Sequence, residues 1–425
     1  MNYPDSVHFL YALGNEIKTA KFGLERIRAV LDALGNPQDR LSIVHVAGTN
    51  GKGSTCALIE AGFRATGLRT GLYTSPHLAE PTERIRIDGR PVSADRFADA
   101  FDRVHAAVER LLAREAIDLH TTYFETVTAM AFLIFAEEAV DRVVLEVGLG
   151  GRLDATNVVR PSLTVITPID FDHEAYLGRG IESIAAEKAG ILKPGVPAVF
   201  ARQRAEAARV LDRRAAELGI PVTRAAESPV EDVSLDARGS RFDVAGATPL
   251  SIRCPLAGEH QVENAVTAAL ALIACGVDRP AIEAGIAAAQ WPGRLEYVRE
   301  RPAIVLDGAH NPAAARAVAA YVARFYAAAR LRLIFGIMRD KAAAEIAGIL
   351  FPLASQVIVT APRQSRALAP ESLRAVADHA NLLIAPTLED ALRWIEDAGP
   401  DEVIFITGSL FLVAEARALL VREAP

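Results

Sequence analysis

Short β-branched segments alternate with longer segments rich in alanine, leucine, arginine and glutamate along most of this chain. The strand candidates are almost continuously apolar, which is typical of a parallel sheet that helices cover on both faces. In the first part of the chain, strands are predicted at residues 42–47, 70–74, 142–147, 163–167 and 196–200. Helices are predicted at residues 23–34, 54–67, 94–114, 124–139, 181–190, 203–218 and 260–275. We therefore expect an α/β fold.

The sequence WPGRLEYVRERP at residues 291–302 predicts a domain boundary, because the alternation starts again after it. We expect a first domain over residues 1–296 and a smaller α/β domain over residues 297–425, which is long enough for one domain. Residues 228–253 alternate around a Gly-Ser turn and predict an antiparallel hairpin at the edge of the first domain. In the second domain, strands are predicted at residues 303–306, 331–335, 356–360 and 402–406, and helices at 312–328, 340–351, 370–378, 388–397 and 410–421.

Composition excludes several classes of protein. The net charge is −7 and no run of five or more basic residues occurs, which argues against a general nucleic-acid binder. The longest apolar segments, such as residues 265–275, are too short to cross a membrane. The N-terminal residues have no basic start and no long apolar segment, so we expect no signal peptide and a cytoplasmic location. Three cysteines without metal-binding spacing predict reduced thiols, and a monomer is expected.

The sequence HVAGTNGKGST at residues 45–55 combines a strand, a glycine-rich turn and the start of a helix. Glycines allow a backbone to approach phosphate groups closely, and the helix N-terminus adds partial positive charge. Lys52 would reach the β- and γ-phosphates, and Ser54 or Thr55 would offer a hydroxyl to Mg²⁺. The spacing differs from the common G-x-x-x-x-G-K-[ST] pattern, and an ordinary glycine-rich turn is the alternative.

Other polar residues follow predicted strands, and in open α/β sheets ligands bind beyond the carboxyl ends of the strands. Glu146 ends an apolar strand, where a carboxylate needs a metal or a salt bridge. His173 follows another strand and is as consistent with an ordinary polar residue as with a ligand. Lys188 lies near a predicted helix end, where a surface lysine is the simplest interpretation.

Nine segments together resemble one family. They are VAGTNGKGS (46–54), YTSPHL (73–78), ERIRI (83–87), TYFETVT (122–128), LEVGLGGRLDATN (145–157), DHEAYLG (172–178), EKAGILKPG (187–195), PGRLE (292–296) and LDGAHNP (306–312). In this order they are similar to folylpolyglutamate synthase/dihydrofolate synthase, a branch of the Mur-ligase superfamily of ATP-dependent amide ligases. The resemblance extends from about residue 5 to residue 420.

The resemblance implies a P-loop, Mur-ligase-like parallel-sheet domain that binds ATP, followed by a smaller Rossmann-like domain. It implies two Mg²⁺ ions and a Lys188 carboxylated on its side-chain nitrogen, which would turn a cation into a carboxylate-like ligand. By resemblance, the nucleotide-binding residues are Thr49, Asn50, Gly51, Lys52, Gly53, Ser54, Asn264, Arg294 and Asp307. The metal ligands would be Ser75, Glu146, His173 and Lys188, and the pterin-substrate residues Lys21, Phe22, Thr122, Leu153, Asp154 and Ala155.

The implied reaction joins L-glutamate to dihydropteroate, to folate γ-glutamyl chains, or to both, through an acyl phosphate, and releases ADP and phosphate. Catalytic roles are expected for Lys52 and Lys188, and His310 is a candidate base, with a loop-capping histidine as the alternative. Three other functions stay open: a Mur-type ligase acting on a cell-wall nucleotide precursor, an ATPase or nucleotide switch without ligase activity, and a non-catalytic pterin-binding protein.

Overall fold

A computed structural model describes residues 1–13, 23–376 and 379–421 of the chain. The chain divides into two compact units. Unit 1 comprises residues 1–231, 243–252 and 263–289, and unit 2 comprises residues 232–242, 253–262 and 290–425. Over the described ranges, no helix is both long and apolar enough to cross a membrane. The proposed domain boundary at residues 296 and 297 stays a prediction.

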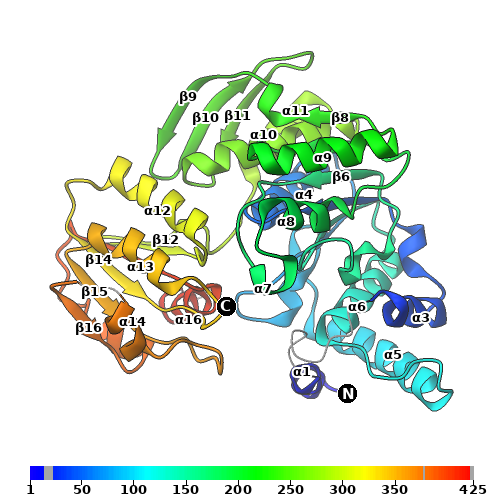
Figure 1. Cartoon of the computed structure of the whole chain (residues 1–425), viewed down its shortest axis with the longest axis horizontal. Coiled ribbons are helices and arrows are strands. Elements are labelled where there is room, and N and C mark those ends of the chain that lie inside the picture. The colour runs from blue at the N-terminus through cyan, green and yellow to red at the C-terminus, as the bar shows by residue number, and fades with distance from the viewer. Residues whose placement is uncertain (14–22, 377–378, 422–425) are drawn as a thin grey trace. The chain divides into compact units, whose positions relative to one another are not determined.

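Unit 1 is built on an eight-stranded sheet with the order β4-β3-β2-β5-β1-β6-β7-β8 (Figure 1). The five strands predicted from the sequence are all present and parallel, and the short strands β3, β4 and β8 extend the sheet at its two ends. All five residues of β1 are buried, which confirms that both faces of the sheet are covered. The strands are β1 (Ile43–Ala47), β2 (Thr70–Tyr73), β3 (Ile85–Ile87), β4 (Arg90–Pro91), β5 (Arg142–Glu146), β6 (Leu163–Ile166), β7 (Ala198–Phe200) and β8 (Val222–Arg224).

Apolar cores pack against this sheet, and two of them are described by their residues. The larger one joins β1, β2 and β5 to the helices α1, α3, α5 and α6, and another joins the ends of β1, β6 and β7 to α8 and α9. The helices of unit 1 are α1 (Tyr3–Ala12), α3 (Glu25–Ala33), α4 (Lys52–Ala65), α5 (Ala94–Ala113), α6 (Tyr123–Glu137), α7 (Glu174–Leu177), α8 (Ile181–Ala189), α9 (Ala205–Leu218) and α11 (Arg279–Ala288). The sequence predicted most of these but missed α1, α7 and α11.

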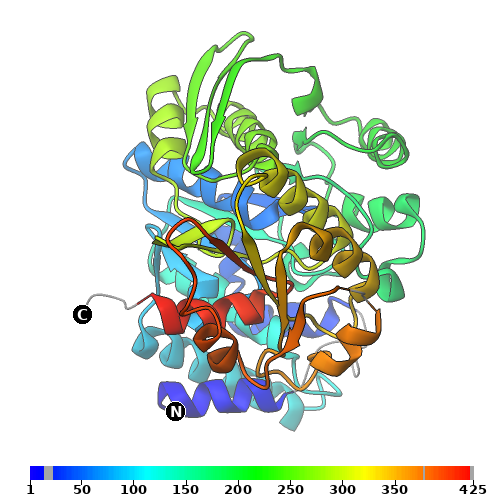
Figure 2. The same ribbon diagram turned by 90° about the vertical axis from the view of Figure 1, so that its left-hand side faces the viewer.

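Unit 2 contains a six-stranded sheet with the order β12-β13-β17-β14-β15-β16 (Figure 2, yellow to red). Its strands are parallel except for β12, which pairs antiparallel with β13. The strands are β12 (Glu296–Glu300), β13 (Ala303–Asp307), β14 (Leu331–Phe335), β15 (Gln356–Val359), β16 (Leu382–Ile384) and β17 (Val403–Thr407). The helices are α12 (Pro312–Phe325), α13 (Ala343–Leu350), α14 (Pro370–Val376), α15 (Leu388–Arg393) and α16 (Leu410–Leu420).

The predicted hairpin is present, but it belongs to a separate three-stranded sheet with the order β11-β10-β9. Its strands are β9 (Val230–Asp236), β10 (Gly239–Val244) and β11 (Leu250–Cys254). Asp236 closes the turn, since its carboxylate accepts hydrogen bonds from the backbone N–H groups of Arg238 (2.6 Å) and Gly239 (2.9 Å). The helix α10 (Glu259–Ala274) follows this sheet.

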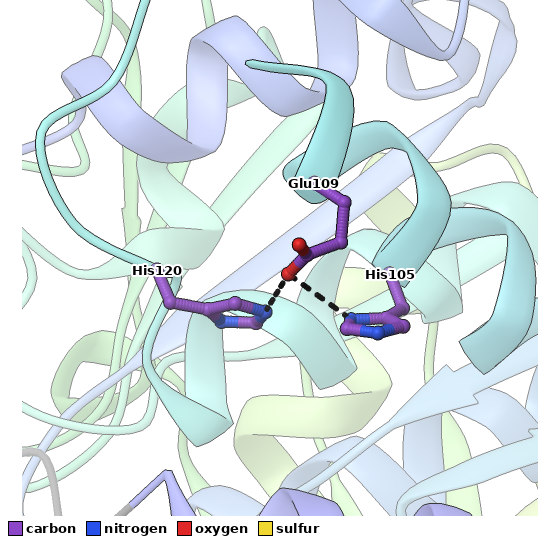
Figure 3. Close-up of side chains that lie close together, drawn as sticks. All are labelled: His105, Glu109 and His120. Atoms are coloured by element: carbon purple, nitrogen blue, oxygen red, sulfur yellow. Dashed lines mark ion pairs between the residues drawn. The ribbon is translucent and has the colours of Figure 1, made fainter. Parts of the chain in front are cut away.

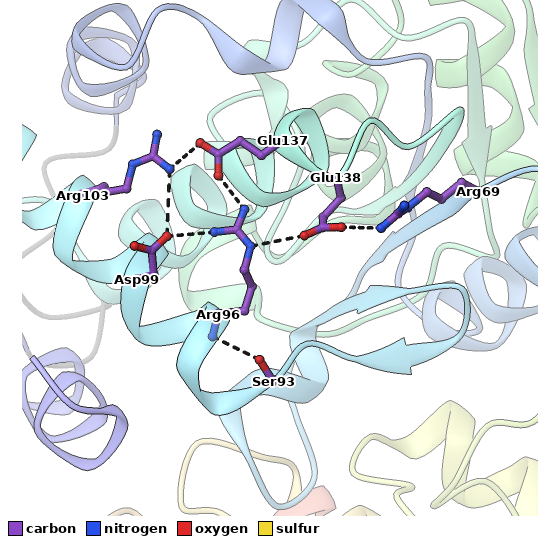
Figure 4. A network of polar contacts seen from close by, with 7 residues as sticks. All are labelled: Arg69, Ser93, Arg96, Asp99, Arg103, Glu137 and Glu138. Carbon is purple, nitrogen blue, oxygen red and sulfur yellow. Dashed lines mark hydrogen bonds and ion pairs between the residues drawn. The ribbon is translucent and has the colours of Figure 1, made fainter.

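A network of ion pairs joins α5 to the C-terminal end of α6 (Figure 4). Arg96 lies at its centre and contacts Glu137 at 2.5 Å and Glu138 at 3.4 Å. Arg69 also pairs with Glu138, which extends the network to the segment before β2. A single exposed ion pair contributes little, whereas a network held by a partly buried arginine fixes several elements together. The other members are Asp99 and Arg103.

Helix α4, which follows the glycine-rich loop, packs unusually closely against α11. A Cβ atom at Gly285 would lie 2.5 Å from the Gly62 Cα and 2.5 Å from the Ala61 carbonyl oxygen. Both obstacles are backbone atoms of α4, so an added methyl group cannot be accommodated by a side-chain rotation. The glycine therefore sets the distance between α11 and the helix that carries Lys52.

We expect Gly285→Ala to lower the free energy of unfolding by about 1–3 kcal/mol, because overpacking forces the two helices apart. Urea unfolding followed by far-ultraviolet circular dichroism measures this change. Gly348→Ala is the matched control, since Gly348 is an exposed residue of α13 with no atom within 4 Å of an added Cβ. The control is expected to gain up to about 1 kcal/mol. Equal effects of the two substitutions would contradict the packing role of Gly285.

Candidate active site

The glycine-rich loop connects β1 to α4 as the sequence predicts. Gly51 has a φ of 81°, in the left-handed region, and the helix begins at the next residue, Lys52. The helix therefore starts two residues earlier than predicted and includes Gly53 in its first turn. The Lys52 side chain folds back over the loop and donates a hydrogen bond to the Thr49 carbonyl oxygen at 3.1 Å. A lysine ammonium thus lies at the start of a helix whose first N–H groups have no acceptor within the helix.

The loop leaves no space for side chains at two of its glycines. A Cβ at Gly48 would lie 1.9 Å from the Thr167 hydroxyl oxygen, and a Cβ at Gly51 would lie 2.2 Å from the Asn264 side-chain oxygen. Asn264 is buried on α10 and therefore lies directly against the loop, although it is more than two hundred positions away in the sequence. The structure thus brings this predicted nucleotide-binding residue to the phosphate loop.

The segment after β6 lies beside the same loop. The backbone N–H groups of Thr49 (3.0 Å) and Asn50 (3.2 Å) both donate to the Pro168 carbonyl oxygen. The Thr49 hydroxyl donates to the Asp170 carbonyl oxygen at 3.0 Å. The carboxyl ends of β1 and β6 are therefore tied together, as expected for neighbouring parallel strands.

Lys188 is not a surface residue. It lies on α8 with only 4% of its surface exposed, and its ammonium donates to the Gly48 carbonyl oxygen at 2.7 Å. Burial and the nearby positive charge of Lys52 lower its pKa to about 7, and the carboxylates of Asp172 and Asp154 oppose this change. The simplest sequence interpretation is therefore wrong, because the lysine points into the protein, at the phosphate loop. With a pKa of about 7, the ammonium and the uncharged amine are both populated near neutral pH.

Glu146 and Ser75 lie together at the ends of β5 and β2. Glu146 is 3% exposed, and its carboxylate accepts a hydrogen bond from the Ser75 backbone N–H at 2.9 Å. Glu146 and Lys52 both act on the buried thiol of Cys56 in α4: burial and Glu146 raise its pKa, while Lys52 lowers it. The buried carboxylate therefore lies in the electrostatic surroundings of the phosphate loop.

His173 begins α7 in the left-handed conformation, with a φ of 53°. About a third of its side chain is exposed, and its Nε2 lies 3.8 Å from the Asp172 carboxylate. It is on the segment that follows β6, the same segment that contacts Thr49. His173 thus follows, three residues later, the Asp170 that contacts the loop, and its role as a metal ligand stays a prediction.

The glycine-rich segment after β5 packs against the helix that carries Lys188. A Cβ at Gly151 would lie 3.0 Å from the Lys188 Cα, and a Cβ at Gly190 would lie 2.6 Å from the Arg152 Cα. Asp154 holds this segment, because its carboxylate accepts from the backbone N–H groups of Leu149 and Thr156 at 2.8 and 2.9 Å. Burial raises the pKa of Asp154. Leu153 and Ala155 flank it, so the proposed substrate residues here are part of a rigid turn.

Two predicted pterin-substrate positions lie outside the described residues, namely Lys21 and Phe22. A third, Thr122, begins α6 through a reciprocal cap: its hydroxyl accepts from the Glu125 N–H at 3.2 Å, and the Glu125 carboxylate accepts from the Thr122 N–H at 2.8 Å. This cap fixes the entry to α6. Whether Thr122 also contacts a substrate stays a prediction.

A buried histidine, His45, was not predicted as a site residue from the sequence. His45 lies on β1 with no exposed surface, and its Nε2 lies 2.9 Å from the Thr156 hydroxyl. Burial lowers its pKa to about 3, which keeps the ring neutral. His45 therefore ties the strand before the phosphate loop to the Asp154 segment. Its position within an apolar strand was the available signal, but the strand pattern alone does not reveal a partner.

The predicted residues of unit 2 form a group of their own. The carboxylate of Asp307, at the end of β13, accepts from the backbone N–H groups of Leu295 and Ala309, both at 2.9 Å. Burial raises the pKa of Asp307, and the positive charge of Arg294 opposes the change. The His310 Nδ1 lies 2.8 Å from the Gly308 carbonyl oxygen. Since a carbonyl only accepts, Nδ1 carries a proton, and in a neutral ring Nε2 would be the basic nitrogen.

Sequence profiles of two domains match this chain. The profile described as Mur ligase middle domain matches residues 46–272, and the profile described as Mur ligase, glutamate ligase domain matches residues 293–410. The dihydrofolate synthase/folylpolyglutamate synthase of Bacillus subtilis is 36% identical over 412 residues, which is 94% of this chain and 95% of that protein. A probable bifunctional folylpolyglutamate synthase/dihydropteroate synthase of Halobacterium salinarum is 38% identical over 98% of this chain, but the chain spans only 51% of that protein.

Solved structures agree with these matches. A Mycobacterium tuberculosis folylpolyglutamate synthase complexed with ADP and AMPPCP has a TM-score of 0.92 and 35% identity, with both chains covered completely. Escherichia coli FolC in complex with DHPP and ADP has a TM-score of 0.87 and 32% identity over 97% of each chain. The chain belongs to the folylpolyglutamate synthase/dihydrofolate synthase family of the Mur ligases.

Proposed function

We propose that the chain joins L-glutamate to the carboxylate of a pterin substrate at the expense of ATP, releasing ADP and phosphate. Dihydropteroate, a folate with its γ-glutamyl chain, or both would supply that carboxylate. The observation that carries the proposal is the meeting of Lys52, the buried Lys188 and Asn264 at one glycine-rich loop. The names of the relatives, and the ADP, AMPPCP and DHPP in the titles of related structures, support the same reaction.

The first step would be in-line attack of the substrate carboxylate on the γ-phosphate of ATP, forming an acyl phosphate and ADP. Lys52 would bind the phosphates and offset the charge that develops during transfer. The N–H groups at the start of α4 would add to this stabilisation. The proposed nucleotide-binding residues are Thr49, Asn50, Gly51, Lys52, Gly53, Ser54, Asn264, Arg294 and Asp307.

In the second step, the amine of L-glutamate would attack the acyl carbon, and phosphate would leave. The amino group of L-glutamate is an ammonium at neutral pH and must lose a proton before it can attack. A base is therefore required. His310 is the proposed base, because its Nδ1 proton is held by the Gly308 carbonyl and its Nε2 is the nitrogen that accepts a proton. The pterin part of the substrate would lie against Lys21, Phe22, Thr122, Leu153, Asp154 and Ala155.

The donor set fits Mg²⁺ only if Lys188 changes its charge. Glu146 supplies a buried carboxylate and Ser75 a hydroxyl, which suit Mg²⁺, whereas His173 supplies a nitrogen and the Lys188 ammonium repels cations. With its pKa lowered to about 7, the Lys188 amine can add CO₂ and release a proton, which yields a carboxylate. We propose that Ser75, Glu146, His173 and carboxylated Lys188 hold two Mg²⁺ ions, which would neutralise charge on the transferred phosphate.

We further propose that the chain acts on small molecules as a monomer in the cytoplasm, without nucleic acid or membrane. Its net charge of −7 opposes association with polyanions and supports the nucleic-acid part of this proposal. Gel filtration combined with light scattering measures the oligomeric state.

The deciding experiment measures ADP release with Mg²⁺ and ATP in the presence of dihydropteroate or tetrahydrofolate, each with and without L-glutamate. Sustained ADP release is expected to require both the pterin substrate and glutamate. The pterin carboxylate accepts the phosphate, and the glutamate amine must then react with the acyl phosphate before the next turnover. Mass spectrometry of the product identifies which pterin gains a glutamate. Release that ignores both additions would instead support an ATPase or nucleotide switch. Dependence on a uridine-nucleotide precursor would support a cell-wall ligase.

A further inference from the structure

Three side chains with metal-binding atoms, none of them among the predicted active-site residues, meet beside the segment that leads into α6. His105 and Glu109 are one turn apart on α5, and His120 lies in the segment between α5 and α6 (Figure 3). The Glu109 carboxylate oxygen lies 3.9 Å from the His105 Nδ1 and 4.0 Å from the His120 Nε2. One ligand atom from each of the three residues lies within 4.8 Å of the others. We propose that these residues bind a divalent transition-metal cation, with Zn²⁺ as the first choice.

The two ring nitrogens that face Glu109 are buried polar atoms that could bind a cation. Both are buried, and neither the His105 Nδ1 nor the His120 Nε2 has a hydrogen-bond partner among residues 1–13, 23–376 and 379–421. Buried polar atoms without partners are costly and require an explanation. A metal ion at the centre of the group would satisfy both nitrogens and one carboxylate oxygen together.

The tautomer of His120 is set by its other nitrogen. His120 Nδ1 lies 2.9 Å from the Thr121 carbonyl oxygen. Because a carbonyl only accepts, Nδ1 carries a proton, and in the neutral ring Nε2 is then the nitrogen whose lone pair faces Glu109. A backbone carbonyl that fixes a histidine in this manner is the usual outer partner of a metal-binding imidazole.

Aromatic rings surround the two imidazoles, and burial favours the neutral form of the His105 ring. The His105 ring stacks on Phe101 at 5.5 Å, and Phe9 of α1 contacts both His105 at 4.7 Å and His120 at 5.6 Å. Burial lowers the pKa of His105, although Glu109 opposes the change. Only the neutral ring has a lone pair for a metal, so the burial of His105 favours metal binding over protonation at this residue.

The ligand types select the class of cation. Imidazole nitrogens suit Zn²⁺, Co²⁺ and Ni²⁺, whereas Mg²⁺ and Ca²⁺ prefer oxygen ligands. Around tetrahedral Zn²⁺, neighbouring ligand atoms lie about 3.4 Å apart, so the two Glu109 distances would shorten by about 0.5 Å on binding. Rotation of the Glu109 side chain, which is 56% exposed, can supply this shift and also opens the site to solvent.

The proposed role is structural. The cation would join α5 to the segment that ends at Thr122, where the reciprocal cap begins α6. It would also lie next to Phe9, and hence against α1. Three protein ligands leave one position for water. None of the residues with a proposed catalytic role, Lys52, Lys188 and His310, belongs to this group. We therefore expect metal to raise thermal stability rather than to take part in the ligase reaction.

The test uses the full chain. A chelator first removes bound metal, and the chain is returned to buffer with excess MgCl₂. It is then titrated with CoCl₂ or ZnCl₂. One equivalent of bound Zn²⁺ per chain is expected by elemental mass spectrometry, with visible absorption of four-coordinate Co²⁺ and a higher melting temperature. His105→Gln, Glu109→Gln and His120→Gln are each expected to weaken binding by at least about tenfold, since even outer partners of metal ligands have effects of this size. His8→Gln and Glu115→Gln, at exposed positions nearby, are matched controls that should bind like the parent chain.

Two further measurements distinguish binding at His105, Glu109 and His120 from binding at the candidate active site and from misfolding of the variants. Binding must persist in a Glu146→Gln chain, because otherwise the ion occupies the candidate active site. In the parent chain, Zn²⁺ is expected to block modification of His105 and His120 by diethyl pyrocarbonate while His8 stays reactive, and this readout does not depend on the folding of any variant. No bound Zn²⁺ in the parent chain, equal binding by the Glu109→Gln chain, or unprotected His105 and His120 would each overturn the proposal.

Discussion

Lys52→Ala is expected to lower the rate of ADP release by about 10²- to 10³-fold while the chain stays folded. The Lys52 ammonium is the positive charge that folds over the phosphate loop, and no backbone N–H group can replace its full charge. Steady-state assays with saturating pterin and glutamate measure this loss, and circular dichroism checks the fold. The loss is expected in kcat as well as in the KM for ATP, because the charge on the transferred phosphate grows during the reaction.

Lys193→Ala serves as the control for Lys52→Ala. Lys193 is a partly buried lysine of the same unit, and burial lowers its pKa, but it has no assigned role in the site. Its replacement should leave turnover close to that of the parent chain. Turnover of the Lys52→Ala chain within tenfold of the parent would remove the phosphate role from this loop.

Lys188→Ala is expected to lower ADP release by at least about 100-fold, and added acetate or formate should restore part of the activity. The alanine leaves space at a buried position beside Gly48, and a small carboxylate can enter it in place of the proposed carboxylated lysine. If the lysine acts instead as an ammonium that holds the Gly48 carbonyl, ethylamine should restore activity and acetate should not. The two rescue experiments therefore distinguish the two charge states.

Carbon dioxide provides an independent check on Lys188. The parent chain is expected to lose activity in buffer freed of CO₂ and to regain it when bicarbonate is added. The Lys193→Ala chain should respond as the parent chain does. Activity that does not depend on CO₂, together with no acetate rescue of the Lys188→Ala chain, would refute the carboxylation.

The sequence predicted the central strands of both sheets well, because their apolar runs have few alternative structures. It missed β3 and four strands that lie at sheet edges, namely β4, β8, β12 and β16, where one side of the strand has no partner and polar residues are tolerated. It also missed α11, a short helix whose buried face combines Ile282 and Ile286 with Ala281 and Gly285 and therefore gives a short apolar pattern.

The sequence predicted which residues belong to the candidate site better than it predicted how buried each of them is. The glycine-rich loop and Lys52 are local in sequence, and the structure confirms their strand-turn-helix context. The burial of Lys188 depends on how α8 packs under the loop, and no pattern within one helix reveals it. His105 and Glu109 share the spacing of one helical turn, which was a usable signal, but the meeting with His120 requires the fold of the segment before α6.

The division into two units has a consequence for spectroscopy. Both tryptophans of the chain, Trp291 and Trp394, lie in unit 2, and unit 1 contains none. Intrinsic tryptophan emission therefore reports the unfolding of unit 2 alone, while circular dichroism reports both units. A difference between the two melting curves would reveal whether unit 1, which contains the phosphate loop, unfolds independently of unit 2.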